Sequence, residues 1–166
     1  MKTLYVLRHA KSAWKDPDLA DIDRPLSARG DRQLASMGAA LSALQLPIEC
    51  VLSSPARRAR DTILALANQL PPGRIPWEEK QGLYMADWQA LLRLVHGLAN
   101  QYDHALLCAH NPGLTDFIGR LSDTTLANLP TCGLAAIRFK VECWKQCGDE
   151  PGKLQLLLTP KGIQGD

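Results

Sequence analysis

Arginines and histidines follow three separate apolar runs of the sequence. These residue types can bind an anionic group and transfer it. Arg8 and His9 come directly after residues 4–7, Arg58 lies shortly after residues 48–53, and His110 follows residues 104–109. Arginine presents a planar fork of donors that matches phosphate oxygens, and histidine can act as a nucleophile through one ring nitrogen. Together these residue types indicate phosphoryl chemistry, provided that the fold brings them together.

Each of these residues also has an ordinary structural explanation when it is taken alone. An Arg-His pair often begins a solvated loop, a single histidine is often a hydrogen-bonded structural residue, and Arg57, Arg58 and Arg60 would suit the wet face of a helix. The combination is more informative, because Lys11 adds a further charge near Arg8 and no cluster of carboxylates stands beside them. A bound anion would relieve that repulsion.

The elements that must position these residues follow from apolar patterning and from turn residues. Ser27 is the expected N-cap of the first helix, Ser54-Pro55 are expected to begin the second, and Pro71-Pro72-Gly73 to end it. The expected strands are 3–8, 48–53, 75–77, 104–109, 134–141 and 154–158, and the expected helices are 28–44, 55–70, 87–101 and 113–121.

Alternating strands and helices predict an α/β fold, a three-layer α/β/α sandwich with a mostly parallel central sheet. No helix separates the last two strands, so we expect one of them to be an antiparallel edge strand. In such sheets ligands bind beyond the carboxyl ends of the strands. Residues 8–9, 53–58 and 110–112 all lie at those ends, whereas His96 and His104 do not, and we expect these two to be structural or surface residues.

Composition limits the classes of protein that fit. The 166 residues suit a single domain, 1–166, of which 46% are hydrophobic and 22% charged. A net charge of +2 argues against non-specific binding to nucleic acid, and no apolar stretch reaches membrane-spanning length. The five cysteines are an odd number without C-x-x-C spacing, and Cys143 and Cys147 lack a histidine at finger spacing. We therefore expect reduced thiols, no metal site and a cytoplasmic protein.

Three motifs resemble those of the histidine phosphatase superfamily, which includes the cofactor-dependent phosphoglycerate mutases. LRHAKS resembles its R-H-G or R-H-A signature, SSPARRARDT its second motif and CAHNPG its third. The stretches DRPLSARG, LYMADWQALL and PTCGLAAIRF are similar to the phosphohistidine phosphatase branch of the SixA type. The resemblance spans nearly the whole chain, and the order and spacing of the three motifs make it specific.

The resemblance implies a role for particular residues. His9 would be the nucleophile that is transiently phosphorylated, Arg8 and Arg58 would bind the phosphoryl group, and His110 would complete the pocket. Lys11 and Ser12 fall where the family often lines the phosphate site. Arg58 fits better than Arg57 because Ala59 and Thr62 stand at the matching offsets. The resemblance implies no metal and no cofactor.

The proton donor for the leaving group stays open in the sequence. Many family members place a carboxylic acid before the third helix, where this chain has Asp87, Glu78 and Glu79, and Asp23 is a further candidate. For each of them a solvated surface position is the simpler explanation. Where the leaving group is an imidazole, water or His110 could supply the proton.

The expected activity is that of a phosphoric monoester or phosphoramidate hydrolase. The branch resemblance favours a phosphatase of protein phosphohistidine, and we expect the protein to be a monomer. Two alternatives stay open, a phosphatase of small phosphate esters and a non-catalytic phosphate-binding module. A nucleotide-binding domain is disfavoured, because neither G-x-G-x-x-G nor G-x-x-x-x-G-K-[ST] follows any expected strand.

Overall fold

The strands of the computed structural model, which describes residues 1–14, 16–70 and 75–164, form one seven-stranded sheet. Its order is β3-β2-β4-β1-β5-β6-β7. The strands are β1 (Lys2–Arg8), β2 (Cys50–Ser53), β3 (Trp77–Glu79), β4 (His104–Ala109), β5 (Leu134–Phe139), β6 (Lys153–Thr159) and β7 (Gly162–Gln164). The main helices are α1 (Ala28–Leu44), α2 (Arg57–Leu66), α3 (Trp88–His96) and α4 (Gly113–Leu121).

The strand directions confirm a mostly parallel sheet with antiparallel strands toward one edge. β1, β2, β3 and β4 pair in parallel with one another, and β5 pairs antiparallel with both β1 and β6. The sheet does not end at these strands, because β7 forms an antiparallel hairpin with β6 that the sequence did not predict. Short connections between consecutive strands give antiparallel pairing, whereas parallel pairs need a crossover.

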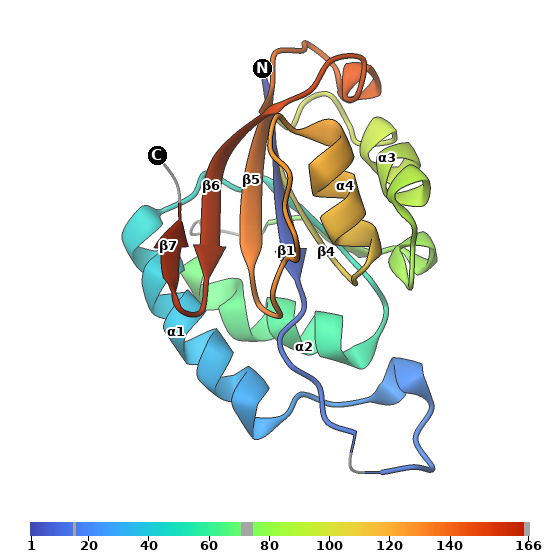
Figure 1. The fold of residues 1–166 in the computed structure, drawn as a ribbon, viewed down its shortest axis with the longest axis vertical. Coiled ribbons are helices and arrows are strands. Elements are labelled where there is room, and N and C mark those ends of the chain that lie inside the picture. The colour runs from blue at the N-terminus through green and yellow to red at the C-terminus, as the bar shows by residue number, and fades with distance from the viewer. Residues whose placement is uncertain (15, 71–74, 165–166) are drawn as a thin grey trace.

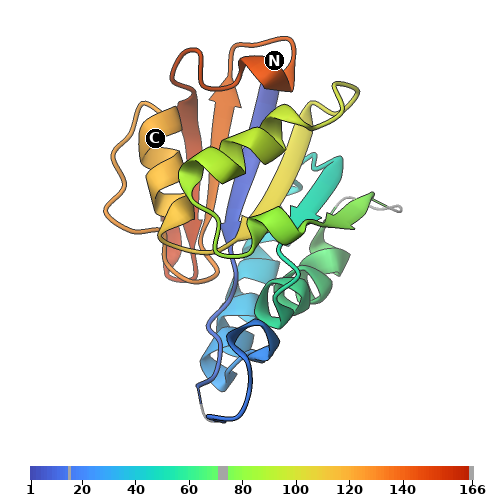
Figure 2. The same ribbon diagram turned by 90° about the vertical axis from the view of Figure 1, so that its right-hand side faces the viewer.

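Helices cover both faces of the sheet, which confirms the three-layer sandwich (Figures 1 and 2). Leu4 and Val6 of β1 face the core under α3 and α4, and Tyr5 and Leu7 face the core under α1 and α2. Successive side chains of a strand point to opposite faces, so a strand buried on both faces is apolar throughout. This is why the run after Thr3 holds no polar residue before Arg8.

Two helices are shorter than expected. α2 begins at Arg57, with Ala56 as its N-cap, and a 3-10 turn over Ala67–Gln69 follows it. α3 ends at His96, where Gly97 is the C-cap, five residues before the expected end. The Pro71-Pro72-Gly73 stop lies outside the described residues. α1 has the expected bounds, and the Ser27 hydroxyl accepts a hydrogen bond from Gly30 N as an N-cap does.

Strand bounds differ from the expected ones mainly at polar positions. The edge strand covers Trp77–Glu79 rather than 75–77, and β2 begins at Cys50 rather than at residue 48. β5 ends at Phe139 rather than 141, and β6 is one residue longer at each end than 154–158. Hydrogen-bonded pairing with the neighbouring strands sets where each strand begins and ends, and this pairing cannot be predicted from hydrophobicity alone.

Two further observations concern membranes and thiols. None of the helices in the described parts of the chain is both long and apolar enough to span a membrane. All five cysteines are free, including Cys143 and Cys147.

The register of the three central parallel strands brings their carboxyl ends together. Arg8 of β1 lies opposite Ala109 of β4, and Ser53 of β2 lies opposite Cys108. The residues that follow these strands, His9, Ser54 and His110, therefore emerge side by side at one edge of the sheet. Residues 9–14 and 16–27, between β1 and α1, extend beyond that edge (blue in Figure 1).

Candidate active site

His9 is held by its backbone and by one ring nitrogen. Its backbone N–H donates to the carbonyl of Ala109, the last residue of β4. Its Nδ1 lies 2.8 Å from the carbonyl oxygen of Ala10. A carbonyl can only accept, so Nδ1 carries the proton, and Nε2 of the neutral ring presents an unprotonated lone pair.

The surroundings of His9 keep its ring neutral. The pKa of His9 is lowered to about 4, mainly by burial and also by the charges of Arg58, Arg8 and Arg24, while the hydrogen bond to Ala10 opposes this shift. The residue is 8% exposed. At neutral pH His9 is therefore an uncharged base, as a nucleophile must be.

Arg8 lies at the end of β1, and part of its guanidinium is without a protein partner. Nη1 donates to the carbonyl of Leu129 at 2.8 Å. Nε is buried and has no hydrogen-bond partner among the described residues. A buried donor without a partner is costly, so this N–H is a group that a ligand oxygen would satisfy.

Arg58 projects from the first turn of α2 toward the two strand ends that carry His9 and His110. It is 3% exposed, as expected for the arginine that the motif selects. Nη1 donates to the backbone oxygen of Asp21 (2.6 Å), and Nη2 donates to Asp21 Oδ2 (3.0 Å) and to Nδ1 of His110 (3.4 Å). Arg57 and Arg60, by contrast, are exposed and pair with Asp61 and Glu79.

Thr62 connects α2 with the loop that carries His9. Its hydroxyl donates to the carbonyl of Arg58 at 2.6 Å and accepts from Ala10 N at 3.0 Å. Thr62 is fully buried. The threonine one helical turn after Arg58 therefore fixes the backbone beside the nucleophile.

His110 faces His9 across the cavity, with ring centroids 5.0 Å apart. Because Arg58 only donates, Nδ1 of His110 accepts, and Nε2 carries the proton that it donates to Ser54 Oγ at 2.7 Å. The pKa of His110 is lowered to about 3, mainly by burial and also by the nearby His9 ring and the charge of Arg58, while the Asp21 carboxylate opposes this shift. Ser54 thus orients His110, and its hydroxyl also accepts from the backbone N–H of Ala56, the N-cap residue of α2, at 3.2 Å.

Asp21 is a residue of the site that the sequence analysis missed. It belongs to the 3-10 turn Asp21–Asp23, and it accepts hydrogen bonds from Tyr84 (2.6 Å), Arg24 (2.8 Å) and Arg58. The Tyr84 hydroxyl and then the two arginines hold the pKa of Asp21 well below its usual range, although burial opposes them. Asp21 is therefore an ionised carboxylate that anchors the two arginines.

These side chains surround a cavity of about 280 Å³ at the carboxyl edge of the sheet. Lys11 and Ser12 line it as expected, and the buried Ser12 hydroxyl accepts from Arg24 Nη2 at 2.6 Å. Lysine and arginine outnumber aspartate in the lining, so the cavity suits an anion. The lining residues are Arg8, His9, Lys11, Ser12, Trp14, Asp21, Arg24, Arg58, Met85, His110, Asn111 and Thr131.

The four carboxylates that the sequence analysis offered as proton donors all lie outside this lining. Asp87 is exposed and caps α3 by accepting from Ala90 N at 2.8 Å, and Asp23 is also exposed. Glu78 pairs with Lys80, and Glu79 pairs with Arg60. Asp21 is the only carboxylate that lines this cavity among the described residues.

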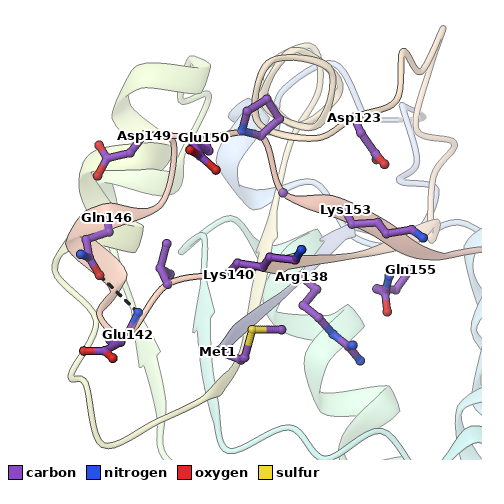
Figure 3. Close-up of a pocket in the computed structure, with 13 residues that line it drawn as sticks. Met1, Asp123, Arg138, Lys140, Glu142, Gln146, Asp149, Glu150, Lys153 and Gln155 are labelled. Atoms are coloured by element: carbon purple, nitrogen blue, oxygen red, sulfur yellow. Dashed lines mark hydrogen bonds between the residues drawn. The ribbon is translucent and has the colours of Figure 1, made fainter.

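His96 and His104 are placed away from the cavity, as the sequence analysis expected. His96 Nε2 bonds to the carbonyl of Cys147 at 2.8 Å, and His104 begins β4 at the opposite end from His110. A larger cavity of about 740 Å³ is lined by a different set of residues, including Arg138, Glu142 and Asp149 (Figure 3). It contains no histidine among the described residues that line it.

Comparison with known proteins places these features in a family. The family model of the histidine phosphatase superfamily (branch 1) matches residues 4–105. An uncharacterised protein of Mycobacterium tuberculosis is 30% identical over 142 residues, which cover 80% of this chain and 86% of that protein.

Solved structures share the fold. A candidate phosphohistidine phosphatase SixA from Nakamurella multipartitia has a TM-score of 0.83 at 21% identity, covering 96% of each chain. A protein histidine phosphatase SixA complexed with tungstate has a TM-score of 0.79 at 21% identity, covering 96% of this chain and 97% of that chain. Arg8, His9, Arg58 and His110 of the three motifs lie together in one cavity. Because the family model spans more than half of the sequence, this chain belongs to the histidine phosphatase superfamily, branch 1.

Proposed function

We propose that this protein is a metal-independent phosphatase that removes phosphate from protein phosphohistidine through a phosphorylated His9. One observation carries the proposal. The hydrogen bond from His9 Nδ1 to the Ala10 carbonyl leaves Nε2 unprotonated in a cavity that also holds Arg8, Arg58 and His110. A neutral imidazole among fixed cations is arranged to attack a phosphoryl group.

Binding of the phosphoryl group follows from the charges of the cavity. Arg8, Arg58 and Lys11 carry positive charge there, and Arg8 Nε has no partner among the residues described. Phosphoryl oxygens would accept from that N–H and reduce the repulsion between the cations. The same charges disfavour protonation of His9 before the substrate arrives.

Transfer would proceed in two steps. The lone pair of His9 Nε2 attacks phosphorus in line, so the new P–N bond forms as the bond to the leaving group breaks. Water then attacks phosphorus, and the P–N bond breaks with its electron pair returning to His9 Nε2. Inorganic phosphate leaves with the protons of the attacking water, and His9 is again neutral with its proton on Nδ1. Arg8 and Arg58 stabilise the charge on the transferring oxygens, while His110, whose Nε2–H bonds to Ser54, completes the wall of the cavity. No step of this sequence uses a metal ion or a cofactor.

The charge state of Asp21 favours phosphohistidine as the substrate. Asp21 is the carboxylate that lines the cavity, and its lowered pKa keeps it ionised at neutral pH, so it has no proton to give. An alkoxide leaving group depends strongly on a proton from the enzyme. A phosphohistidine that has taken a proton from water on its other ring nitrogen instead leaves as a neutral imidazole, a weak base whose conjugate acid has a pKa of about 6.5. Water is then sufficient as the proton source. The SixA names of two structural relatives support the same substrate class.

The test compares substrates that share a phosphoryl group and differ in the basicity of the leaving group. We expect kcat/KM for a phosphohistidine peptide and for p-nitrophenyl phosphate to exceed that for phosphoserine by about 100-fold or more, the scale of a missing general acid. Equal rates on all three would contradict the phosphohistidine assignment and favour a general phosphatase of small esters. Binding of the peptide without turnover would identify a non-catalytic module.

Treatment with a chelator tests the metal-independent part of the proposal. Activity on the phosphohistidine peptide should be unchanged after incubation with EDTA and desalting. Loss of activity that a divalent metal restores would contradict it.

A further inference from the structure

A second hollow, which we call the basic groove, lies beside the cavity at the same edge of the sheet. Its volume is about 660 Å³, and it runs between the first half of α1, the loop 126–131 and the end of β6. Ser36 of α1 donates to the carbonyl of Pro160 at 3.1 Å, which holds the β6–β7 turn against α1 (Figure 1). The lining residues are Arg29, Arg32, Gln33, Ser36, Leu126, Asn128, Pro130, Thr131, Leu157, Thr159, Pro160 and Lys161.

The basic groove meets the active-site cavity at Thr131, which is hydrogen-bonded to Gln33. Thr131 lines both hollows, and its hydroxyl accepts from Gln33 Nε2 at 2.8 Å. Gln33 Oε1 accepts in turn from the backbone N–H of Lys11, two residues from His9, at 2.9 Å. The shared Thr131 therefore places the basic groove directly beside the cavity that holds His9.

All charged side chains that line the basic groove among the described residues are positive. Arg29, Arg32 and Lys161 are exposed, and none of them forms an ion pair within the described parts of the chain. No carboxylate of the described residues lines the groove. Arg29 and Arg32 lie near the positive end of the α1 dipole, where cations are disfavoured, and Asp31 of the same turn is not part of the lining. An acidic ligand would offset both effects.

The remaining lining favours a polypeptide over a nucleic acid. Leu126, Pro130, Leu157 and Pro160 give the groove apolar walls. Its described lining holds no aromatic ring, whereas single-stranded nucleic acids are commonly bound by bases that stack on aromatic side chains. The larger cavity of Figure 3 lacks the one-sided charge, because Arg138, Lys140 and Lys153 share its lining with Asp123, Glu142, Asp149 and Glu150.

We propose that the basic groove docks an acidic segment of the substrate protein, next to the phosphohistidine that enters the active site. This inference rests on the proposed function and adds the kind of partner that the site accepts. The occupant is a stretch rich in Asp and Glu with apolar residues between them. Its carboxylates pair with Arg29, Arg32 and Lys161, while the phosphoryl group sits at His9.

The test uses two synthetic peptides that each carry one phosphohistidine, flanked in one by Glu and in the other by Gln. The wild type should hydrolyse the Glu-flanked peptide with a kcat/KM about tenfold higher, and the preference should shrink as ionic strength rises. The double variant Arg29→Gln/Arg32→Gln should lose this preference and keep the wild-type kcat/KM on the Gln-flanked peptide. Both residues are exposed, so the variant should fold normally.

The matched control is Arg138→Gln/Lys140→Gln, which removes the same net charge from exposed residues of the larger cavity (Figure 3). It should retain the preference for the Glu-flanked peptide. Equal hydrolysis of both peptides by the wild type, or equal loss in both double variants, would overturn the docking site and leave the proposed function intact. Failure to hydrolyse either peptide would overturn both proposals. Inhibition by an oligonucleotide that exceeds inhibition by polyglutamate would assign the groove to nucleic acid instead.

Discussion

The tautomer of His9 decides which atom of the site can attack phosphorus. A single carbonyl, that of Ala10, accepts from Nδ1–H and leaves Nε2 free, while burial and three arginines keep the ring uncharged. The second histidine, His110, is also neutral but in the other tautomer, with Nδ1 directed at Arg58 and Nε2–H at Ser54. Both rings therefore enter the reaction with defined donor and acceptor atoms.

The lowered pKa of His9 predicts that the ring stays neutral well into the acid range. Its NMR signals should not change between about pH 8 and pH 5 and should titrate with a midpoint of about 4. Between the ordinary pKa of about 6.5 and this value, the unfolded chain binds a proton that the folded chain does not, so acidification in this window lowers stability. The His9→Ala variant identifies the signal, and a midpoint near 6.5 would contradict the burial argument.

Asp21 shows what the sequence could not resolve at the scale of residues. His9, Arg58 and His110 were predictable because each follows a strongly apolar strand and stands in a motif. Asp21 and Asp23 both precede Arg24 in a polar loop, and the sequence drew attention to Asp23. The 3-10 turn directs Asp21 to Arg58 and Tyr84 and leaves Asp23 exposed, and that choice depends on contacts with distant elements.

At the scale of elements, the loops after the strands are fixed by neighbouring helices. Thr62 of α2 holds Ala10, and α4 packs its first residue against the segment before α3. A β-carbon on Gly113 would lie 1.9 Å from the carbonyl oxygen of Ala86, so only glycine fits this approach. A contact with a neighbouring element also accompanies the start of α2, which begins later than expected. Ser54 bonds to His110, and Ala56 rather than Ser54 is the N-cap residue.

The hydroxyl of Thr62 should matter more than its shape. Thr62→Val keeps the volume but leaves Ala10 N–H without its acceptor, so we expect the free energy of unfolding to fall by about 1–3 kcal/mol. Because Ala10 adjoins His9, kcat/KM should fall as well. Thr62→Ser retains the hydroxyl and should stay closer to the wild type in urea unfolding and in activity. Equal effects of the two substitutions would contradict the role of the hydrogen bond.

Two glycines of α4 should respond in opposite directions to alanine. Gly113→Ala forces α4 away from Ala86 and should destabilise the fold by about 1–3 kcal/mol, with lower activity because His110 precedes this helix. Gly119 is exposed in the same helix, and a β-carbon added there would meet nothing within 4 Å, so Gly119→Ala should stabilise by about 0.5–1 kcal/mol. Thermal unfolding measures both, and stabilisation by Gly113→Ala would refute the close approach.

At the scale of the whole molecule, function is concentrated at one edge of the sheet. The order β2-β4-β1 places three strand ends side by side, and the active-site cavity and the basic groove open at that edge. The sequence predicted this convergence because parallel strands share their carboxyl edge. It did not predict the groove, which needs α1, the loop 126–131 and the β6–β7 turn to meet, or the hairpin itself, which ends in a short strand with little apolar pattern.

Transient phosphorylation of His9 follows most directly from the arrangement of this site. Wild-type protein is mixed with a radiolabelled phosphohistidine peptide, quenched during the first turnover and digested, and the label is located by mass spectrometry. We expect a label that is stable in base, labile in acid and attached to the peptide containing His9, and no label and no turnover in His9→Ala. Label on another residue, or turnover at the wild-type rate by His9→Ala, would contradict the assignment of His9 as the nucleophile.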